Sequence, residues 1–305
     1  MSSKVTKGIY LALCTAFISG VSNFVNKIAV SLVKPPLVFT AEKNLYVGLA
    51  IVGLLIFSWK FKEIKKLSGR DVLYLTLIGI IGGSIPFYLF FTGLSMIPAV
   101  NGAIIHKTLF IWVAILTIPL LKEKVSKLQI LGVALLFFAN FFIGGFIKFQ
   151  FSAGELLVLS ATLLWAVENI LAKKILPHVD ADIVVAARMG LGSIILMAAA
   201  FILAPAATMK GFNLSEVQWT WMAITVALLL GYTMTWYRAL KLAPATTVAS
   251  VLVSATLITN ILSAIFITHA WDITMGIQIL LTTLGIGLFW LSSRKTLATH
   301  LTAKS

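Results

Sequence analysis

The chain has 305 residues, of which 60% are hydrophobic and only 11% are charged, and its mean hydropathy is +1.02. Soluble domains carry about 25% charged residues, so this composition excludes an ordinary soluble enzyme or binding domain and indicates a polytopic membrane protein. The single cysteine, Cys14, excludes a disulfide within the chain and a metal site built from several cysteines.

Apolar stretches of about 20 residues follow one another from the N-terminus to the C-terminus. That length crosses ~30 Å of hydrocarbon as an α-helix, and uninterrupted apolar stretches of this length are typical of helices rather than of barrel strands. We therefore predict an all-α membrane protein with ten transmembrane helices. The predicted spans are 8–31, 38–58, 72–95, 99–121, 127–147, 154–175, 182–204, 217–240, 245–268 and 273–292.

The net charge of +14 would suit a nucleic-acid partner, but its distribution argues against one. Basic residues gather at the termini and in alternate loops, whereas the remaining loops hold only Lys34, Lys148 and Lys210. This asymmetry follows the positive-inside rule and predicts a plasma-membrane protein with both termini in the cytoplasm. The lipid bilayer, not a polyanion, is the predicted partner of the basic residues. The basic residues in the two long alternate clusters are Lys60, Lys62, Lys65, Lys66, Arg70, Lys122, Lys124 and Lys127.

The sequence contains an internal repeat. Residues 11–27 align without a gap on residues 157–173, at an offset of 146 residues that carries Asn23 onto Asn169. The same offset relates other distant stretches, residues 94–103 among them. A constant offset shared by separate stretches indicates duplication of a whole structural unit.

Each copy of the repeat holds five spans, which is an odd number. The second copy must therefore enter the membrane from the opposite face, so that matching positions are related by a pseudo-two-fold axis in the membrane plane. We predict two inverted five-helix repeats, 1–147 and 153–293, followed by a cytoplasmic tail, 294–305.

Ionisable residues near the centre of a spanning helix cost roughly 2.5–3.5 kcal/mol each on insertion scales, so each requires an explanation. With the N-terminus inside, the first half places polar residues in the outer half of spans one, two and four, and the second half places them in the inner half of spans six to eight. This predicts one polar cluster on each side of the midplane, as two alternating gates around a shared cavity require. The outer set is Asn23, Lys27, Glu42, His106 and Lys107, and the inner set is Glu168, Asn169, Arg188 and Trp236.

Structural roles compete with functional ones at several of these positions. Lys27 lies near a helix end and can snorkel to the interface, and Glu42 can form a purely structural pair with Lys107 or Lys27. Glu168 can pair in the same way with Arg188, and a histidine such as His106 can bond to a neighbouring helix.

The aromatic residues also have two readings. Trp236 and Tyr237 suit either an interfacial belt or substrate stacking. Trp165 lies near the middle of span six, where its indole N–H needs a partner from a substrate or from another helix. In span three, Gly82 and Pro86 with neighbouring glycines predict either a kink or close helix packing.

Two segments resemble those of a known family. Residues 153–169 resemble the start of the second repeat in EamA-type members of the drug/metabolite transporter superfamily, and residues 121–132 resemble the turn between spans four and five. Arg188 falls where that family often has an arginine. The resemblance implies ten helices in inverted repeats, a central cavity, and export of amino acids or other small metabolites. The chain departs from the pattern at Glu42, which occupies the first-half counterpart of Arg188, and at His269, the counterpart of Glu123.

No catalytic constellation, metal site or cofactor site is predicted. The four histidines are scattered, and no metalloprotease or phosphate-loop motif is present in the sequence. The chain is therefore not expected to be an enzyme.

The leading hypothesis is a secondary transporter that exports small metabolites, amino acids in the first place, by alternating access to a midplane cavity. The ionisable groups within the spans are mostly cationic, which favours a substrate with a carboxylate. Proton coupling through Glu42 or Glu168 is left open, and the alternative function is a channel or a membrane-embedded binding subunit of a larger assembly. Span ten carries no charge and is expected to be peripheral or a homodimer face. The predicted substrate contacts are Asn23, Tyr88, Trp165, Asn169, Arg188 and Trp236, and the predicted gate or coupling residues are Lys27, Glu42, His106, Lys107 and Glu168.

Overall fold

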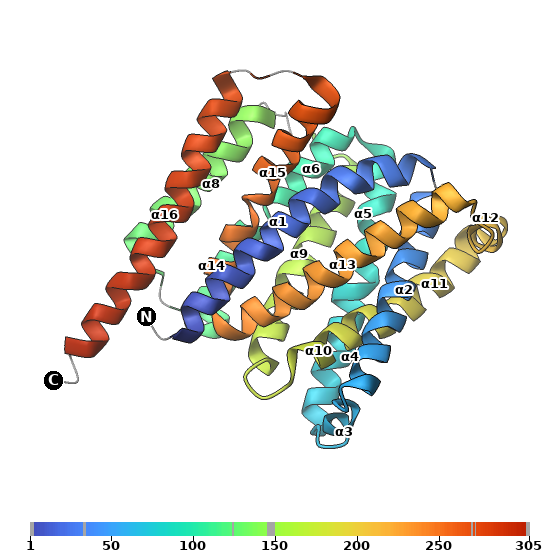
Figure 1. The fold of residues 1–305 in the computed structure, drawn as a ribbon, viewed down its shortest axis with the longest axis horizontal. Helices are drawn as coiled ribbons and strands as arrows, with labels where there is room; N and C mark the ends of the chain where they lie inside the picture. Colours follow the sequence, from blue (N-terminus) through green and yellow to red (C-terminus); the bar gives the residue numbers. More distant parts are fainter. Residues whose placement is uncertain are drawn as a thin grey trace.

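The described part of the chain is built from helices, as the computed structural model in Figure 1 shows. The structure describes residues 3–32, 35–123, 125–144, 150–269, 271 and 273–302. Within these ranges the side chains of residues 3, 27, 30, 31, 99, 100, 103, 140–144 and 293–302 are not described.

The predicted spans follow one another in the predicted order. In the first half they are α1 (Ser3–Leu32), α2 (Pro36–Phe57), α4 (Gly69–Gly83) with α5 (Ile85–Met96), α6 (Ala99–Lys107) with α7 (Leu109–Leu121), and α8 (Lys127–Gly144). In the second half they are α9 (Ala153–Ile175), α10 (Ala181–Ala186) with η1 (Ala187–Leu191) and α11 (Gly192–Leu203), α13 (Glu216–Leu242), α14 (Ala245–Leu252) with α15 (Ala255–Ser263) and η2 (Ala264–Thr268), and α16 (Ile273–Thr302).

The lengths of these helices support a multi-pass membrane protein. Among the described residues, nine helices are long and apolar enough to cross a membrane, and Lys127–Ala139 forms a shorter apolar helix in the place of the fifth span. Two short connecting helices were not predicted, α3 (Phe61–Ile64) and α12 (Pro205–Gly211). The last helix continues to Thr302, through most of the segment that the sequence predicted as a tail.

Spans four and nine break at matching positions. Thr108 separates α6 from α7, and Val253 and Ser254 separate α14 from α15, which is the same place at the offset of the repeat. Both spans also begin in the same way, because Pro98 (φ −57°, ψ 137°) and Pro244 (φ −56°, ψ 140°) precede the first helical residue with nearly identical backbone angles. Interruptions at corresponding places in two repeats are typical of the substrate sites of transporters.

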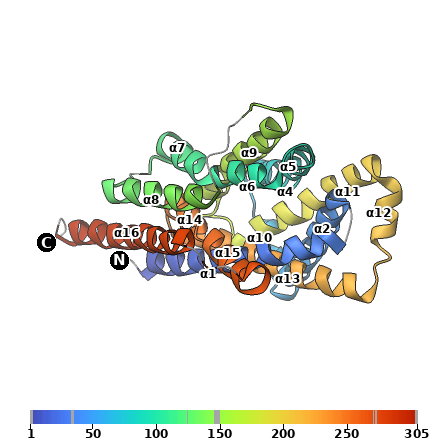
Figure 2. The ribbon, with the colours of Figure 1, turned by 90° about the horizontal axis from the view of Figure 1, so that it is seen from above.

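The helices pack in a pattern that is unchanged when the two halves are exchanged. Helix α1 packs on α13 and on α14 and α15, just as α9 packs on α4 and α5 and on α6 and α7. Span two packs on span seven, and α8 packs on α16. Figure 2 shows the two layers that result, with α5, α6, α7 and α9 on one side and α1, α13 and α15 on the other. In Figure 1, α1 ascends from the N-terminus whereas α9 descends towards the loop before α10, as inverted repeats require.

Several helices begin at capping boxes, which satisfy backbone N–H groups that have no partner inside the helix. At the start of α9, Ser152 accepts a bond from the N–H of Glu155, and the Glu155 carboxylate accepts one from the N–H of Ser152. Ser68 with Asp71 does the same at α4, and Ser215 with Gln218 at α13. These caps fix the residues at which three of the spans begin.

Span three is interrupted between α4 and α5. Ser84 lies between them in a non-helical conformation (φ −133°, ψ −72°), two residues before Pro86. Proline has no backbone N–H, so the carbonyl of Gly82, four residues earlier, loses its partner within the helix. Close packing accompanies the break, because Gly83 lies against the carbonyl of Arg188 in η1. Both readings of the glycine-rich stretch, the kink and the close contact, are therefore confirmed.

The contact at Gly83 predicts a strong effect of one methyl group. In Gly83→Ala the added Cβ would overlap the carbonyl oxygen of Arg188, so we expect a destabilisation of about 1–3 kcal/mol, seen as a lower thermal midpoint of the purified protein in detergent. Gly53→Ala is the matched control, because a Cβ at Gly53 in α2 meets nothing within 4 Å. An unchanged midpoint for Gly83→Ala would contradict the packing of span three on span seven.

Candidate functional site

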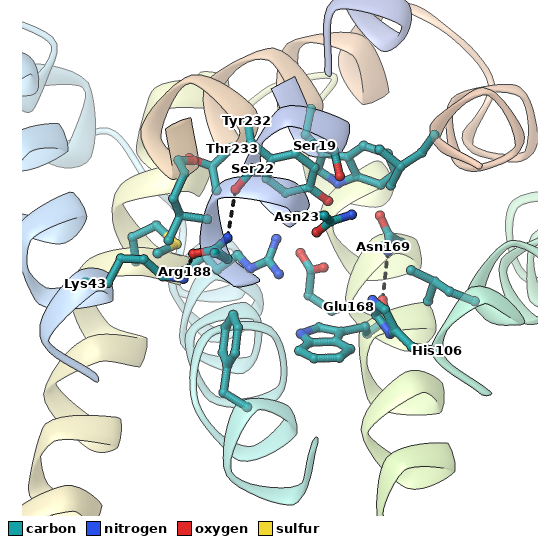
Figure 3. A pocket seen from close by; sticks show the side chains of 18 residues that line it. Ser19, Ser22, Asn23, Lys43, His106, Glu168, Asn169, Arg188, Tyr232 and Thr233 are labelled. Atoms are coloured by element: carbon teal, nitrogen blue, oxygen red, sulfur yellow. Dashed lines mark hydrogen bonds between the residues drawn. The ribbon is translucent and has the colours of Figure 1, made fainter. Parts of the chain in front are cut away.

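A cavity of about 250 Å³ lies at the centre of the bundle, between the two layers. Figure 3 shows that its polar side chains come from both halves of the chain and point towards one another. The breaks in spans four and nine lie at its wall, since His106, Leu109 and Leu252 flank them. The remaining lining residues are Ser19, Ser22, Asn23, Asn26, Lys43, Phe87, Trp165, Glu168, Asn169, Arg188, Met189, Leu229, Tyr232, Thr233 and Trp236.

The carbonyl oxygen that Pro86 leaves free inside span three anchors two side chains of the second half. The indole Nε1 of Trp165 donates to the Gly82 oxygen at 3.0 Å, and Nε of Arg188 donates to the same oxygen at 3.3 Å. A buried carbonyl without a partner costs free energy, so both bonds are favoured by the break itself. The interruption of one helix thus orients a large aromatic ring and a guanidinium in the cavity wall.

Arg188 and Glu168 are joined through a tyrosine rather than by direct contact. Nη1 of Arg188 donates to the hydroxyl of Tyr237 at 3.3 Å, and that hydroxyl donates to Oε1 of Glu168. All three side chains are buried, with exposed fractions of 8%, 0% and 1% for Arg188, Tyr237 and Glu168. Arg188 lies in the π-helical turn η1, and such turns occur frequently at functional sites.

Acceptors and donors remain unused within this network. Among the described side chains, Oε2 of Glu168 and Oδ1 of Asn169 are buried acceptors without a partner, although Nδ2 of Asn169 donates to the Trp165 carbonyl at 2.8 Å. Arg188 carries five N–H donors, and only its Nε and one from Nη1 have partners among the described residues. The site therefore presents two acceptors suited to an ammonium group and a guanidinium suited to a carboxylate.

The opposite wall is a chain of polar contacts from α1 to α2. Nζ of Lys43 donates to Oδ1 of Asn26 at 3.2 Å, and Nδ2 of Asn26 donates to Oγ of Ser22 at 3.0 Å. The polar residues Ser22 and Asn26 of span one therefore face the cavity. The charged residues that line the cavity are Lys43, Arg188 and Glu168, so its wall carries more positive than negative charge.

Aromatic rings form the apolar part of the wall. Trp165 packs edge-on against Phe87 (5.3 Å between ring centroids) and against His106 (4.9 Å). On the facing helix, Tyr232 stacks on Trp236 at 6.1 Å with an interplanar angle of 13°. An apolar group between these two sets of rings would be contacted from both sides.

The structure gathers most of the predicted residues into this one cavity, where the sequence predicted two clusters at different depths. Residues of both halves line this cavity. The predicted residues that line it are Asn23, His106, Trp165, Glu168, Asn169, Arg188 and Trp236.

The other predicted residues lie elsewhere. Tyr88 is 37% exposed and does not line the cavity, because its neighbour Phe87 faces that way instead. Glu42 and Lys107 are not in the lining either. Lys27 belongs to α1, but its side chain is outside the described residues.

Several of the structural readings can now be decided. Glu42 does not pair with Lys107, because neither oxygen of its carboxylate has a partner among the described residues. The interfacial belt is wrong for Trp236 and Tyr237, which are only 2% and 0% exposed. The indole of Trp165 finds its partner in another helix.

The roles of the Gly82 carbonyl and of Tyr237 were not predicted from the sequence. Pro86 was the signal for the first, since a proline within a predicted span frees the carbonyl four residues earlier. The second had no comparable signal, because the bond from Tyr237 to Glu168 depends on how two spans of the second half approach one another.

The cavity is sealed at the end that carries the N-terminus. Asn23, in the far third of α1, is exposed, whereas Trp236 and Tyr237, near the end of α13, are buried. Below them Nζ of Lys173 donates to the carbonyls of Leu240 and Ala243, both at 2.6 Å, and so closes the C-terminal end of α13. The cavity is thus reached from the side opposite the N-terminus.

A cluster of ion pairs, which we call the latch, lies at the sealed end. Lys60, after α2, contacts Asp180 at 3.0 Å and Asp182 at 2.6 Å. Asp182, in α10, also contacts Arg238 of α13 at 2.8 Å. The latch therefore ties spans two, seven and eight together. The ion pairs of the described residues all lie at this end of the molecule, the fourth being His178 with Asp71.

The latch changes the pKa of the groups that lie outside the spans. Burial alone would lower the pKa of Lys60, but its hydrogen bonds to Asp182 and Asp180 outweigh burial and raise it. Burial alone would raise the pKa of Asp180, but hydrogen bonds from the Asp182 N–H and from Lys60 lower it. A raised lysine pKa contributes stability that is lost as the pH rises through it, and a lowered aspartate pKa contributes stability that is lost as the pH falls through it. The latch is therefore complete across the neutral range.

Comparison with known proteins agrees with this architecture. The model of the EamA-like transporter family matches the chain twice, over residues 6–145 and 152–291, which coincide with the two halves. The chain belongs to the EamA-like transporter family. It is a multi-pass membrane protein of a family of transporters, with the repeated helical fold described above.

Individual relatives support the same assignment. The chain is 28% identical over 247 residues to an uncharacterized transporter of Archaeoglobus fulgidus, covering 76% of this chain and 81% of the relative. It is also 28% identical over 206 residues to an uncharacterized transporter of Synechocystis sp., covering 61% of this chain and little more than half, 57%, of that relative. A protein of known crystal structure superposes with a TM-score of 0.76 over 96% of this chain and 98% of that one, and at 14% identity it shows the fold alone.

Loss of the latch should open the sealed end. In Asp182→Asn both of its ion pairs weaken. Pairs with partly exposed cations such as Lys60 and Arg238 contribute ~0.2–1 kcal/mol each, so loss of both, up to about 2 kcal/mol, predicts up to about a thirtyfold shift towards a state open at the N-terminal end. The measurement is the rate at which a water-soluble thiol reagent labels Ser250→Cys, a buried position in α14, in a Cys14→Ser background. Glu63→Gln, an exposed acid of α3 at the same end, is the control. Equal labelling rates in the Asp182 and Glu63 variants would show that the latch does not hold this end closed.

Proposed function

We propose that this EamA-family member is a secondary transporter of small zwitterionic metabolites, amino acids in the first place, in the plasma membrane. Substrate binds in the central cavity and reaches the two sides of the membrane in turn. Export is the direction that the family resemblance implies. The proposal rests on one observation: a single buried site combines the spare donors of Arg188 with the unpartnered acceptors of Glu168 and Asn169.

The size of the cavity supports a small substrate. Pockets for drug-sized ligands measure ~300–1,000 Å³, and this cavity of about 250 Å³ lies below that range. The guanidinium of Arg188 matches the planar, two-oxygen geometry of a carboxylate, which a lysine ammonium does not. In Figure 3 the side chains of Arg188, Glu168, Asn23 and Asn169 surround the same space. An α-ammonium and an α-carboxylate would both find partners there.

The aromatic wall supports an apolar or aromatic side chain on that substrate. Trp165 and Phe87 on one side and Trp236 on the other would contact it, and Lys43 adds positive charge at the α1 and α2 side. Burial of the side chain between rings favours binding without demanding a particular hydrogen-bond pattern. The wall therefore suits a range of amino acids.

Alternating access follows from the two like halves. The positive-inside rule places the N-terminal end in the cytoplasm, so the described state is the one open to the outside and closed on the inside by the latch. Opening to the cytoplasm requires the latch residues Lys60, Asp182 and Arg238 to separate. When each half then adopts the conformation that the other half had, the cavity closes on the outer side. The cycle is proposed to be carrier-like; an ion current through the purified protein would instead support a channel.

The discrimination between zwitterions and simple carboxylates tests the site. In liposomes with purified protein, we expect saturable counterflow of labelled amino acids that unlabelled amino acids inhibit more strongly than their 2-hydroxy acid analogues, which lack the ammonium. Glu168→Gln should reduce this preference about tenfold or more, because a hydrogen bond to a charged group is worth ~1.5–3 kcal/mol. Inhibition by the 2-hydroxy acids should change much less.

Two further observations make the result decisive. Glu63→Gln changes an exposed acid far from the cavity and should keep the wild-type preference. Equal preference in wild type and Glu168→Gln, or absence of saturable counterflow for every amino acid, would overturn the proposed substrate class.

A further inference from the structure

Glu42 lies in a second buried polar site, outside the central cavity. Its side chain is 0% exposed, and both carboxylate oxygens are without a hydrogen-bond partner among the described residues. The carboxylate lies directly against Gly211 at the end of α12, where a Cβ atom would overlap it. The transport site does not use this group, because Glu42 is not in the lining of the cavity.

An ionised carboxylate cannot remain in such a place without compensation. Burial of an unpaired charge costs so much that the group becomes neutral instead. Hard metal ions do not fit as compensation, since Ca²⁺ requires six to eight oxygen ligands and Glu42 belongs to no group of three or more metal-ligating side chains among the described residues. A proton requires only the carboxylate itself.

Among the described side chains, the charged groups on the surrounding helices do not offer a substitute for the proton; the side chain of Lys27, a predicted partner of Glu42, is outside the described residues. Lys43, the next residue of α2, donates to Asn26, and Tyr46, one turn along α2, packs on Trp219 at 5.5 Å. Helix α11 has no titratable residue, and Tyr88 of α5 is exposed. The other titratable groups of the elements packed on α2 are Arg188, Tyr232 and Tyr237 at the cavity, Asp182, Arg238 and Lys241 at the latch end, and the exposed Lys210 and Glu216.

We propose that Glu42 is a proton-binding site that α12 covers. In the described state the carboxylate has taken up a proton from water on the side of α12 to become a neutral carboxylic acid, and Gly211 then closes over it. Release of the proton requires α12 to move away from α2. Because α12 connects spans seven and eight, which carry Arg188 and Trp236, protonation of Glu42 is linked to the position of the helices that form the cavity wall.

The coupling part of this inference rests on the proposed transport function, but the proton site can be tested without a substrate. Infrared spectra of the purified protein in lipid should contain the carbonyl stretch of a buried, protonated carboxylic acid at neutral pH. Glu42→Gln, which has the same shape without a titratable group, should remove that band. Glu216→Gln, an exposed acid at the start of α13, should leave it in place.

A second variant tests the role of α12. Gly211→Ala would displace either the carboxylate or α12, so Glu42 should become hydrated and its acid band should disappear at neutral pH, while the thermal midpoint reports whether the protein still folds. A band that survives in Glu42→Gln would overturn the proton site, and a band that is unchanged in Gly211→Ala would overturn the cover.

Transport assays then separate the two proposals. If Glu42 couples a proton, counterflow of labelled amino acids in wild type should depend on the pH on the α12 side of the liposome membrane, and Glu42→Gln should lose that dependence while it keeps saturable counterflow. Loss of the infrared band in Glu42→Gln together with unchanged pH dependence would overturn the coupling alone. Absence of all amino-acid flux would contradict the transport function without affecting the infrared result.

Discussion

The carbonyl oxygen of Gly82 is the group on which the rest of the site depends. Pro86 deprives it of its partner inside span three, and the indole of Trp165 and the guanidinium of Arg188 take that place. Three spans thereby meet at one oxygen atom near the centre of the molecule. A buried carbonyl with two donors is satisfied, whereas displacement of span six or of span seven would remove one of the two donors. The site is thus built on a backbone defect that the fold has to compensate.

Charge in the bundle is arranged in three separate places, and each place does something different. In the cavity, Tyr237 mediates between Arg188 and Glu168, so neither is fully neutralised by the other and both can engage a ligand. At the sealed end, Asp182 shares its carboxylate between two cations in direct contact. Under α12, Glu42 has no partner at all among the described groups. Direct pairing suits a contact that must hold, incomplete pairing suits binding, and absence of pairing suits proton uptake.

Much of the fold could be predicted from the sequence because its determinants are local or repeated. Apolar length gives the spans, and the constant offset between residues 11–27 and 157–173 gives the two halves. The matching breaks at Thr108 and Ser254 follow the same offset, although the sequence alone did not reveal them. The short helix α12 was missed, since seven residues between two spans carry no periodic signal of their own.

The candidate site was predicted in composition rather than in arrangement. Asn23, Trp165 and Arg188 could be found because a polar or aromatic residue deep in a span needs a partner. Their convergence in one cavity could not be predicted, because the depth of a residue along a helix does not determine the direction in which its side chain points. Phe87 instead of Tyr88 illustrates this limit, since neighbouring residues on a helix face directions about 100° apart.

The most direct test of this account is to return a backbone N–H to the break in span three. Pro86→Ala can bond the Gly82 carbonyl within the helix, so Trp165 and Arg188 would lose their shared acceptor. Equilibrium binding of a labelled amino acid to the purified variant should weaken about tenfold or more, while its thermal midpoint stays the same or rises. Wild-type affinity in Pro86→Ala, with the variant fully folded, would contradict the claim that this carbonyl positions the site.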